Sequence, residues 1–348
     1  MLDTGSLGGV WAIAFHPDRK HLLGGGEDGI RRWLLPDGEE VGKQTAAQVL
    51  AISVSRDRKW IVRGTNAGAS VWDAEMLDKV VDVEGTAIVS AVDVSPDSTR
   101  FATGTGSNDN KASVWSITSG KRLIGPLKHD ITPTGVRFSP NGEHVATSCP
   151  GGSVRIFDSH TGDQLLHIKA NEPSLWSFSV TPLAWSNDGQ QIFTITDNNK
   201  IKSFAFPEGS QLAESPIRDN TYSISLAGNG KFIATVAADG VSFLDTSTLT
   251  PVGTAIQDSE AKWSTPVSLD SDQIATGRRD GKVIIYNLAD FLPDSYGPFQ
   301  VSICPFIMLA CRISTVPSLI LTHYVRHLLA RSLRPRVAMT INHLTLSL

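Results

Sequence analysis

Short runs in which apolar and polar residues alternate recur along this chain, and each run ends in a turn sequence. Alternation with a period of two is typical of a β-strand that buries one face. The turns combine Ser, Pro, Asp, Asn and Gly, which favour tight reversals of the backbone. The pattern therefore predicts a repeating all-β structure. The alternating runs lie at residues 10–15, 49–54, 89–94, 133–138, 180–185, 221–226 and 264–269.

A second and a third strand are predicted after each run, and the third ends on a large apolar residue. Tight turns such as Asp28-Gly29 separate these two strands, as in a two-residue hairpin. The ending recurs with a mean period of about 42 residues between Trp33 and Tyr286, and a period near 40–45 residues indicates four-stranded propeller blades. The residues at this ending are Trp33, Trp72, Trp115, Phe157, Phe204, Leu244 and Tyr286.

Each repeated segment, which runs from an alternating run to the large residue that ends the third strand, is called a phrase below. These phrases resemble the WD-repeat family over residues 10–287. The family pattern places Ser-Pro-Asp-Gly after the first strand of a blade and Trp-Asp at the end of the third, as at residues 95–97 and 72–73. The phrases are most similar to those of fungal WD-repeat domain-containing proteins. The resemblance implies a seven-bladed β-propeller of four-stranded antiparallel blades.

The repeats divide the chain into a propeller and a tail. We expect the propeller to occupy residues 1–303 and a basic tail, disordered or atypical, to occupy residues 304–348, where the repeat stops. The individual repeats are expected near residues 10–48, 49–88, 89–130, 131–174, 175–220, 221–262 and 263–303.

Two segments are candidates for the strand that completes the last blade. An unpaired strand edge is a liability that proteins cover. The start of the chain offers only nine residues before Val10, and they include Gly8 and Gly9. Residues 299–303 offer an alternating run after a turn, and on this basis they are the preferred closing strand.

Charge is distributed unevenly along the chain. Of the 31 Lys and Arg residues five lie in residues 299–348, whereas all 35 Asp and Glu residues lie before them. An acidic propeller argues against binding to a phosphate backbone, so we expect no nucleic-acid partner. The uncharged run at residues 313–324 is shorter than a membrane span requires, so we expect no stable membrane insertion, although a basic amphipathic anchor is an alternative.

Cysteine usage and the first residues point to an intracellular protein. The three cysteines form neither a disulfide framework nor a CxxC pair, and the start lacks the basic and apolar regions of a secretory signal. We expect the cytoplasm, with the nucleus left open, and a monomer within a larger complex.

The sequence offers no evident catalytic set, so we expect no enzyme, no cofactor and no metal. A nucleophile elbow and a Walker loop are both missing, and most carboxylates occupy turn positions. The tripeptide at residues 16–18 is interpreted as a turn. The propeller histidines lack a metal-ligand spacing such as His-x3-His. His129 falls where the family places a structural histidine, but Pro150 and Phe157 at two of its partner positions predict that this network is mostly absent.

The candidate partner surface comes from the register of the innermost strands. In a propeller the loops that lead into these strands surround one end of the central channel, where blade packing does not dictate the side chain. Aromatic residues and Arg are enriched at interaction hot spots. The alternative is that these aromatic side chains pack between blades. The residues predicted to bind a partner are Trp11, Leu50, Ile88, Tyr222, Trp263, Arg278 and Arg279.

The sequence therefore predicts a non-enzymatic scaffold that docks a protein or peptide partner on one face of the propeller. One alternative is a regulatory or sensor module separated from a larger nucleotide-binding signalling protein. A second alternative is a propeller hydrolase with a metal ion in the channel. It needs several inward Asp, Glu, His or Asn side chains, and the register supplies only Gln48 and Asn220 toward that set.

Overall fold

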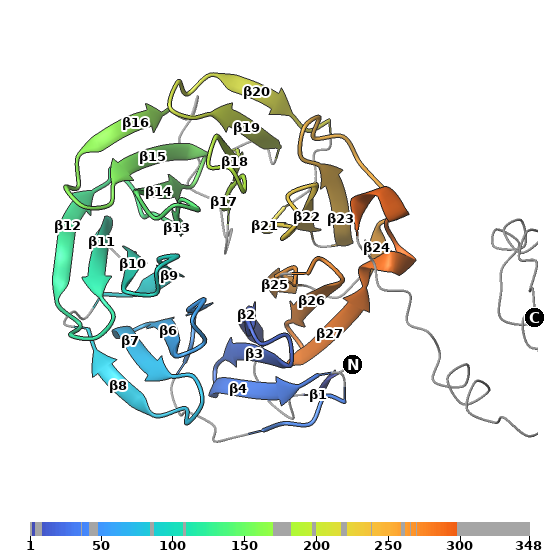
Figure 1. Cartoon of the computed structure of the whole chain (residues 1–348), viewed down its shortest axis with the longest axis horizontal. Helices are drawn as coiled ribbons and strands as arrows, with labels where there is room; N and C mark the ends of the chain where they lie inside the picture. The colour runs from blue at the N-terminus through green and yellow to red at the C-terminus, as the bar shows by residue number, and fades with distance from the viewer. Residues whose placement is uncertain are drawn as a thin grey trace, which may run out of the picture. The chain divides into compact units, whose positions relative to one another are not determined.

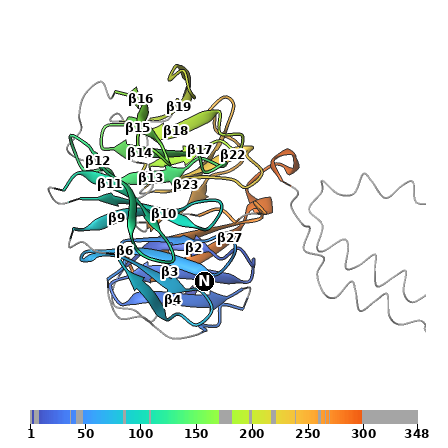
Figure 2. The same cartoon turned by 60° about the vertical axis from the view of Figure 1, so that its left-hand side comes forward.

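The computed structural model places antiparallel sheets around a central channel (Figure 1, Figure 2). It describes residues 2–3, 9–35, 37–41, 48–83, 87–106, 109–169, 182–196, 200–216, 221–237, 239–258, 262–264, 266–268 and 270–297. Within these residues six sheets have four strands and one has three. The prediction of an all-β propeller with four-stranded antiparallel blades is confirmed.

We number the sheets 1 to 7 in chain order, each starting from its innermost strand. The innermost strands are β2 (Val10–Phe15), β5 (Ala51–Val54), β9 (Val89–Val94), β13 (Gly135–Phe138), β17 (Leu183–Trp185), β21 (Ser223–Leu226) and β25 (Lys262–Ser264). The second strands are β3 (His21–Gly26), β6 (Trp60–Thr65), β10 (Arg100–Thr105), β14 (His144–Cys149), β18 (Gln191–Ile195), β22 (Phe232–Ala237) and β26 (Gln273–Arg278).

The third strands carry the large residue that ends each phrase. They are β4 (Gly29–Leu34), β7 (Gly68–Asp73), β11 (Lys111–Ser116), β15 (Ser153–Asp158), β19 (Ile201–Ala205), β23 (Gly240–Asp245) and β27 (Lys282–Asn287). The outer strands are β8 (Lys79–Asp82), β12 (Arg122–Lys128), β16 (Gln164–Ile168), β20 (Gln211–Glu214), β24 (Ile256–Gln257) and β1 (Leu2–Asp3).

The phrase-ending residues occupy the same place in every sheet. Each one pairs with the second residue of the preceding strand, or its equivalent, in the antiparallel register. The pairs are Leu22–Trp33, Ile61–Trp72, Phe101–Trp115, Val145–Phe157, Ile192–Phe204, Ile233–Leu244 and Ile274–Tyr286. The substitutes for Trp in sheets 4 to 7 therefore fill the same position as the tryptophans in sheets 1 to 3.

The hydrophobic core lies between neighbouring sheets. Leu23 and Ile30 of sheet 1 pack with Val49 and Ile61 at sheet 2, and equivalent clusters follow around the ring. A further cluster joins Trp33 and other residues of sheet 1 to sheet 7. Because full burial of one such side chain contributes about 1.5–3 kcal/mol, each sheet is stabilised by both of its neighbours.

The start of the chain supplies the outer strand of sheet 7. In β1, Leu2 pairs with Val283 and Asp3 pairs with Lys282 of β27. The preference for residues 299–303 was wrong in this respect, and those residues lie outside the described part of the chain. β1 therefore pairs with the first two residues of β27 at its outer edge.

Sheet 1 departs from the predicted four strands. Its described strands are β2, β3 and β4, and an isolated bridge between Trp33 and Glu40 marks the outer edge of β4. After β27 come two 3-10 helices, η1 (Leu288–Asp290) and η2 (Asp294–Tyr296). Within the described residues, no helix combines the length and the apolar composition that a membrane crossing requires.

The Gly24-Gly25-Gly26 run is explained by close approach of neighbouring groups. A Cβ atom on Gly24 would lie 2.7 Å from the ring of Trp33, and one on Gly26 would lie 2.3 Å from the carbonyl oxygen of Gly9. Such distances are too short for any side chain. These glycines are therefore required for packing and do not form a phosphate-binding loop.

Candidate functional site

The two ends of the channel differ in construction, and we name them by the innermost strands. The entry face is the end where these strands begin, and the turn face is the end where they finish in turns such as that at residues 55–58. Trp11 lies in β2, and Leu50, Ile88 and Tyr222 immediately precede β5, β9 and β21. All four side chains are half-buried at the entry face. Gln48, from the hydrolase alternative, is also half-buried, and Asn220 lies outside the described residues.

The other predicted partner-binding residues belong to sheet 7. Arg278 ends β26 and forms ion pairs with Asp258 at 3.7 Å and with Asp280 at 3.1 Å, whereas Arg279 is exposed. Trp263 lies in β25, and its side chain is outside the described part. These ion pairs hold the Arg278 side chain mostly buried, whereas Arg279 extends into solvent.

The Trp11 side chain and the Arg279 backbone both lie near Gly9, where sheet 1 adjoins sheet 7. A Cβ atom built on Gly9 would lie 3.2 Å from Nε1 of Trp11 and 3.2 Å from the carbonyl oxygen of Arg279. The strands of these sheets also pack against each other, β2 against β25 and β26. The Trp11 side chain and the Arg279 backbone thus both lie beside Gly9, while Leu50 and Ile88 belong to the following sheets of the ring.

His129 forms a buried network beneath the entry face. Its Nδ1 lies 2.9 Å from the carbonyl oxygen of Leu127, so this nitrogen donates. Nε2 lies 2.8 Å from Oγ1 of Thr147, and the ring meets Phe157 edge-on at 5.8 Å. Burial lowers the pKa of His129 to about 4, so the ring is neutral at pH 7. The expectation of a mostly absent network was too pessimistic, because Thr147 supplies the hydroxyl partner and Phe157 packs on the ring.

The turn face opens into a cavity of about 730 Å³. Turn prolines and aromatic side chains form its wall, namely Pro17, Pro96, Pro140, Phe15, Phe138 and Trp185. A smaller cavity of about 100 Å³ is lined by apolar residues of the innermost strands, such as Ala12, Ala51 and Ala91, and by Arg137 and Ser225. The channel is therefore narrow in this section and widens toward the turn face.

One ion pair lines this cavity, and it connects sheet 3 to sheet 4. Nη1 of Arg137 lies 3.6 Å from Oδ1 of Asp93, and the backbone amide of Phe138 donates to Oδ2 of Asp93 at 2.8 Å. Burial raises the pKa of the Asp93 carboxyl, and the Arg137 guanidinium opposes that shift. Asp93 is thus engaged in joining two sheets.

Sequence reasoning missed this link, but a positional signal exists. Ser53 and Ser225 occupy the corresponding position of their innermost strands. Ser53 accepts a hydrogen bond from the amide of Val94 at 3.2 Å, and Ser225 accepts one from the amide of Val267 at 3.1 Å. A short polar residue before the end of the innermost strand therefore indicates an acceptor for the next sheet.

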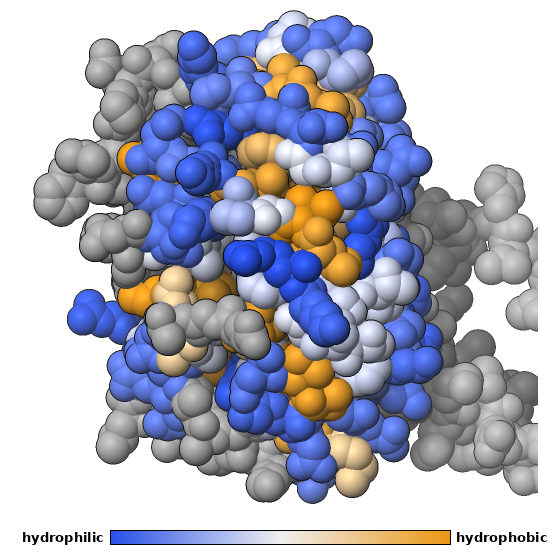
Figure 3. All heavy atoms as spheres, turned by 90° about the vertical axis from the view of Figure 1, so that its left-hand side faces the viewer, coloured by the Kyte–Doolittle hydropathy of each residue, from blue (hydrophilic) through white to orange (hydrophobic). Residues whose placement is uncertain are grey.

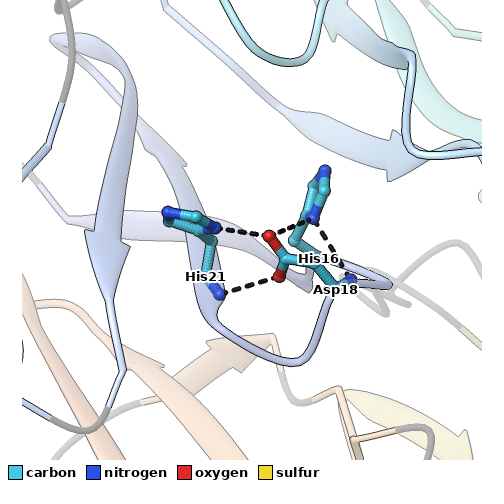
Figure 4. A group of neighbouring side chains, drawn as sticks. All are labelled: His16, Asp18 and His21. Atoms are coloured by element: carbon cyan, nitrogen blue, oxygen red, sulfur yellow. Dashed lines mark hydrogen bonds and ion pairs between the residues drawn. The ribbon is translucent and has the colours of Figure 1, made fainter.

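The turn between β2 and β3 gathers His16, Asp18 and His21 (Figure 4). Oδ2 of Asp18 lies 3.1 Å from Nδ1 of His16 and 2.6 Å from Nδ1 of His21. Burial alone would raise the pKa of the Asp18 carboxyl, but hydrogen bonds from the Lys20 amide and the His21 ring lower it below its ordinary value. The turn assignment of residues 16–18 is confirmed. The spacing His-x3-His, which suits one face of a helix, does not describe this cluster. In the β2–β3 hairpin the turn instead brings together His16 and His21, which are five residues apart.

Apolar side chains also appear on the outer side of the ring (Figure 3). Four exposed aliphatic residues are the second residues of successive outer strands: Val80, Leu123, Leu165 and Leu212, each about half exposed. Their recurrence at one position shows that the repeat places them there. Exposed single aliphatic residues are common on protein surfaces, and no site is assigned to them.

Comparison with protein families gives matches over three parts of the chain. The model described as "Anaphase-promoting complex subunit 4 WD40 domain" matches residues 107–187. The model described as "WD domain, G-beta repeat" matches residues 2–30 and 79–116. The second model thus matches the start of the chain, including the β1 segment that pairs with β27.

Similar proteins include several from animals. The small ribosomal subunit protein RACK1 of Caenorhabditis elegans is 28% identical over 156 residues, 43% of this chain and 47% of that protein. The cilia- and flagella-associated protein 52 of Homo sapiens is 25% identical over 57% of this chain and 32% of its own length. Protein groucho of Drosophila melanogaster is 24% identical over 66% of this chain and 31% of its own length.

The matched region spans less than half the length of each of these relatives. None of the three is fungal, so the likeness to fungal proteins stays a prediction. The repeat in this chain is an antiparallel sheet, four-stranded in six of the seven described sheets, with a large apolar residue at the end of its third strand. The chain carries WD repeats folded as a β-propeller, and it is similar to WD-repeat proteins, which generally act as non-enzymatic scaffolds.

Proposed function

We propose that this protein is a non-enzymatic interaction scaffold that docks a protein or peptide partner on its entry face. The observation that carries the proposal is the set of large side chains at one end of the ring. Trp11, Leu50, Ile88 and Tyr222 are all half-buried there. Each keeps apolar surface that binding of a partner would remove from water.

The junction of sheets 1 and 7 is the proposed centre of this surface. Trp11 and the backbone of Arg279 approach the same point near Gly9, and the Arg279 side chain is exposed. Trp, Tyr and Arg side chains provide most of the binding energy in many interfaces. The strand β2 holds Trp11 in place, so little conformational entropy is lost when a partner binds.

The turn face supports this choice by contrast. Its polar side chains are used inside the turns, as where Ser55 donates to Asp57 at 2.6 Å and Ser95 donates to Asp97 at 2.5 Å. Its ion pair between Asp93 and Arg137 joins two sheets. Groups already engaged in the fold offer less to a partner.

The experiment is affinity purification of the tagged full chain from its own cells, followed by identification of the bound proteins. The triple variant Trp11→Ala, Tyr222→Ala and Trp263→Ala is compared with the unaltered protein. Arg56→Ala is the matched control, because Arg56 is exposed and lines the turn-face cavity.

We expect the triple variant to lose the specific partners while it keeps its thermal unfolding temperature, and we expect Arg56→Ala to retain them. Full recovery of the same partners by a folded triple variant would overturn the entry-face assignment. Loss of the partners in Arg56→Ala alone would move the site to the turn face.

The proposal includes the architecture that presents this face. We infer a ring of seven blades in which the three-stranded sheet 1 also counts as a blade, supported by its cluster with sheet 7 and by the Trp33–Glu40 bridge. We also keep the propeller limit at residue 303, an intracellular location, and a monomer held in a larger complex. The narrower proposal, a regulatory module like those of fungal signalling proteins, rests on the resemblance of the repeats.

A further inference from the structure

The β2–β3 turn differs in chemistry from the equivalent turns. In five other sheets a serine begins the turn, its hydroxyl donates to the Asp or Asn two residues later, and it accepts from the amide five residues later. These serines are Ser55, Ser95, Ser139, Ser186 and Ser268. In sheet 1 an imidazole, His16, replaces the hydroxyl, and a second imidazole, His21, stands five residues later.

Both imidazoles turn toward the carboxylate between them (Figure 4). Nδ1 of His16 and Nδ1 of His21 lie 3.1 Å and 2.6 Å from Oδ2 of Asp18. One ligating atom from each of the three residues can be chosen so that all lie within 4.8 Å of one another. Among the described residues, His16, Asp18 and His21 form the group of at least three His, Cys, Asp or Glu side chains whose ligating atoms lie this close together.

The carboxylate is held in this orientation by the backbone. Oδ1 of Asp18 accepts from the amide of Lys20 at 2.7 Å and from the amide of His21 at 3.1 Å, which leaves Oδ2 to the imidazoles. The turn itself is fixed by the repeat, because Arg19 has φ of 62° and the equivalent Arg58 and Ser271 have φ of 69° and 61°. The three groups therefore meet without a costly rearrangement of the chain.

We infer that His16, Asp18 and His21 form a binding site for a divalent transition-metal ion, with Zn²⁺ the best match. Two imidazole nitrogens and one carboxylate oxygen suit Zn²⁺, which accepts three protein ligands and a water molecule. With bonds of about 2.0–2.2 Å, a tetrahedral ion separates its ligand atoms by about 3.4 Å. The His16–Asp18 separation is already near this value, and His21 must rotate away from Asp18 as the ion replaces their hydrogen bond.

The position of the site leaves room for the ion to enter. The side chains of Asp18 and His21 are 19% and 25% exposed, whereas that of His16 is 9% exposed. The adjacent Pro17 and Phe15 line the turn-face cavity. The bound ion would tie the start of β3 to the end of β2 in sheet 1. An ion that binds the folded chain alone raises its stability by mass action.

The test is Zn²⁺ titration by calorimetry of the purified full chain after chelator treatment and removal of the chelator. Two variants replace a ligand by the residue that other turns carry: His16→Ser, as in Ser55, and His21→Gln, as in Gln191 and Gln273. Both keep side chains that the repeat already accommodates, and circular dichroism confirms the fold. The control His160→Gln removes an exposed histidine outside the cluster.

We expect the unaltered chain and His160→Gln to bind one Zn²⁺ ion with the same affinity, and each ligand variant to bind at least tenfold more weakly. Zn²⁺ should raise the unfolding temperature of the first two proteins by more than that of the ligand variants. The inference is overturned if the unaltered chain binds no Zn²⁺, if both ligand variants bind as tightly as it does, or if His160→Gln weakens binding to the same extent.

Discussion

The two ends of the propeller are built from different kinds of residue. At the turn face, sheets 2, 3, 4, 5 and 7 repeat one device, in which a Ser hydroxyl donates to an Asp or Asn side chain two residues later. At the entry face, the residues at equivalent positions differ from sheet to sheet, and Trp11, Leu50, Ile88 and Tyr222 share only size and partial burial. The same repeat therefore builds both ends, with similar side chains in the turns of the turn face and different side chains at the entry face.

The difference shows which positions the fold constrains. A turn must satisfy its own backbone groups, so its side chains are determined by local hydrogen bonding and change little from sheet to sheet. The loops into the innermost strands need only reach the channel. Their side chains are therefore available for recognition, and this contrast motivates the assignment of the partner site to the entry face.

The largest loss of unfolding free energy is expected when Asp93, a structural group at the turn face, is replaced. Replacing Asp93 by Ala removes the acceptor for the Phe138 amide and the ion-pair partner of Arg137. Loss of a hydrogen-bonded, mostly buried charge costs about 2–3 kcal/mol, seen as a lower midpoint in urea unfolding. Asp93→Asn should cost about half as much, because the amide oxygen still accepts from Phe138. Equal stability of Asp93→Ala and the unaltered protein would contradict the structural role.

A smaller effect is expected from His129, beneath the entry face, as a pH dependence of the free energy of unfolding. The ordinary His pKa of 6.5 falls to about 4 for His129 in the folded chain, so only the unfolded chain takes up this proton between these values. The contribution of His129 to stability is therefore present above pH 6.5 and decreases as pH falls toward 4, by about 2 kcal/mol at pH 5. Urea unfolding at pH 7 and pH 5 measures this loss.

Two comparisons separate this effect from the titration of carboxyl groups. His129→Gln should lack that part of the pH dependence, whatever its absolute stability. At the turn face, hydrogen bonds hold the pKa values of Asp97 and Asp188 below 3.8, so their contribution is lost only at more acidic pH. The same slope between pH 7 and pH 5 in His129→Gln would show that the His129 network is not its source.

The smallest effect on stability is expected for Arg279→Ala. The Arg279 side chain is exposed at the entry face, and substitutions of this kind usually change stability by less than about 0.5 kcal/mol. If the entry face binds the partner, affinity should nevertheless fall about tenfold, as for a residue that contributes about 1.4 kcal/mol at an interface. Surface plasmon resonance with the purified partner measures this, and unchanged affinity would exclude Arg279 from the site.

Much of the fold could be predicted because each strand carries its own local signal. The period of the Trp phrase gave the repeat, and the pairing of Ile233 with Leu244 shows that even the weakest copy is in phase. The closing strand could not be predicted this way. The choice between β1 and residues 299–303 depended on which segment reaches the free edge of β27, and alternation within a segment does not contain that information.

The candidate sites, like the fold, could be predicted from the sequence only in part. The sequence placed Trp11, Leu50, Ile88 and Tyr222 at one end of the ring because register along a strand determines which end a residue occupies. It did not place Asp93 beside Arg137, or the imidazoles of His16 and His21 around Asp18, because these contacts depend on how sheets and turns meet in space.

The sequence by itself determined the repeat, the antiparallel sheets and the residues that end each phrase, since periodicity and turn chemistry act over a few residues. Only the tertiary structure decided how the ring closes, which Arg of sheet 7 is held in ion pairs, and which polar side chains converge. These properties depend on contacts between segments far apart in the chain or on the exact path of a turn. Hydrophobic burial between sheets fixes them cooperatively.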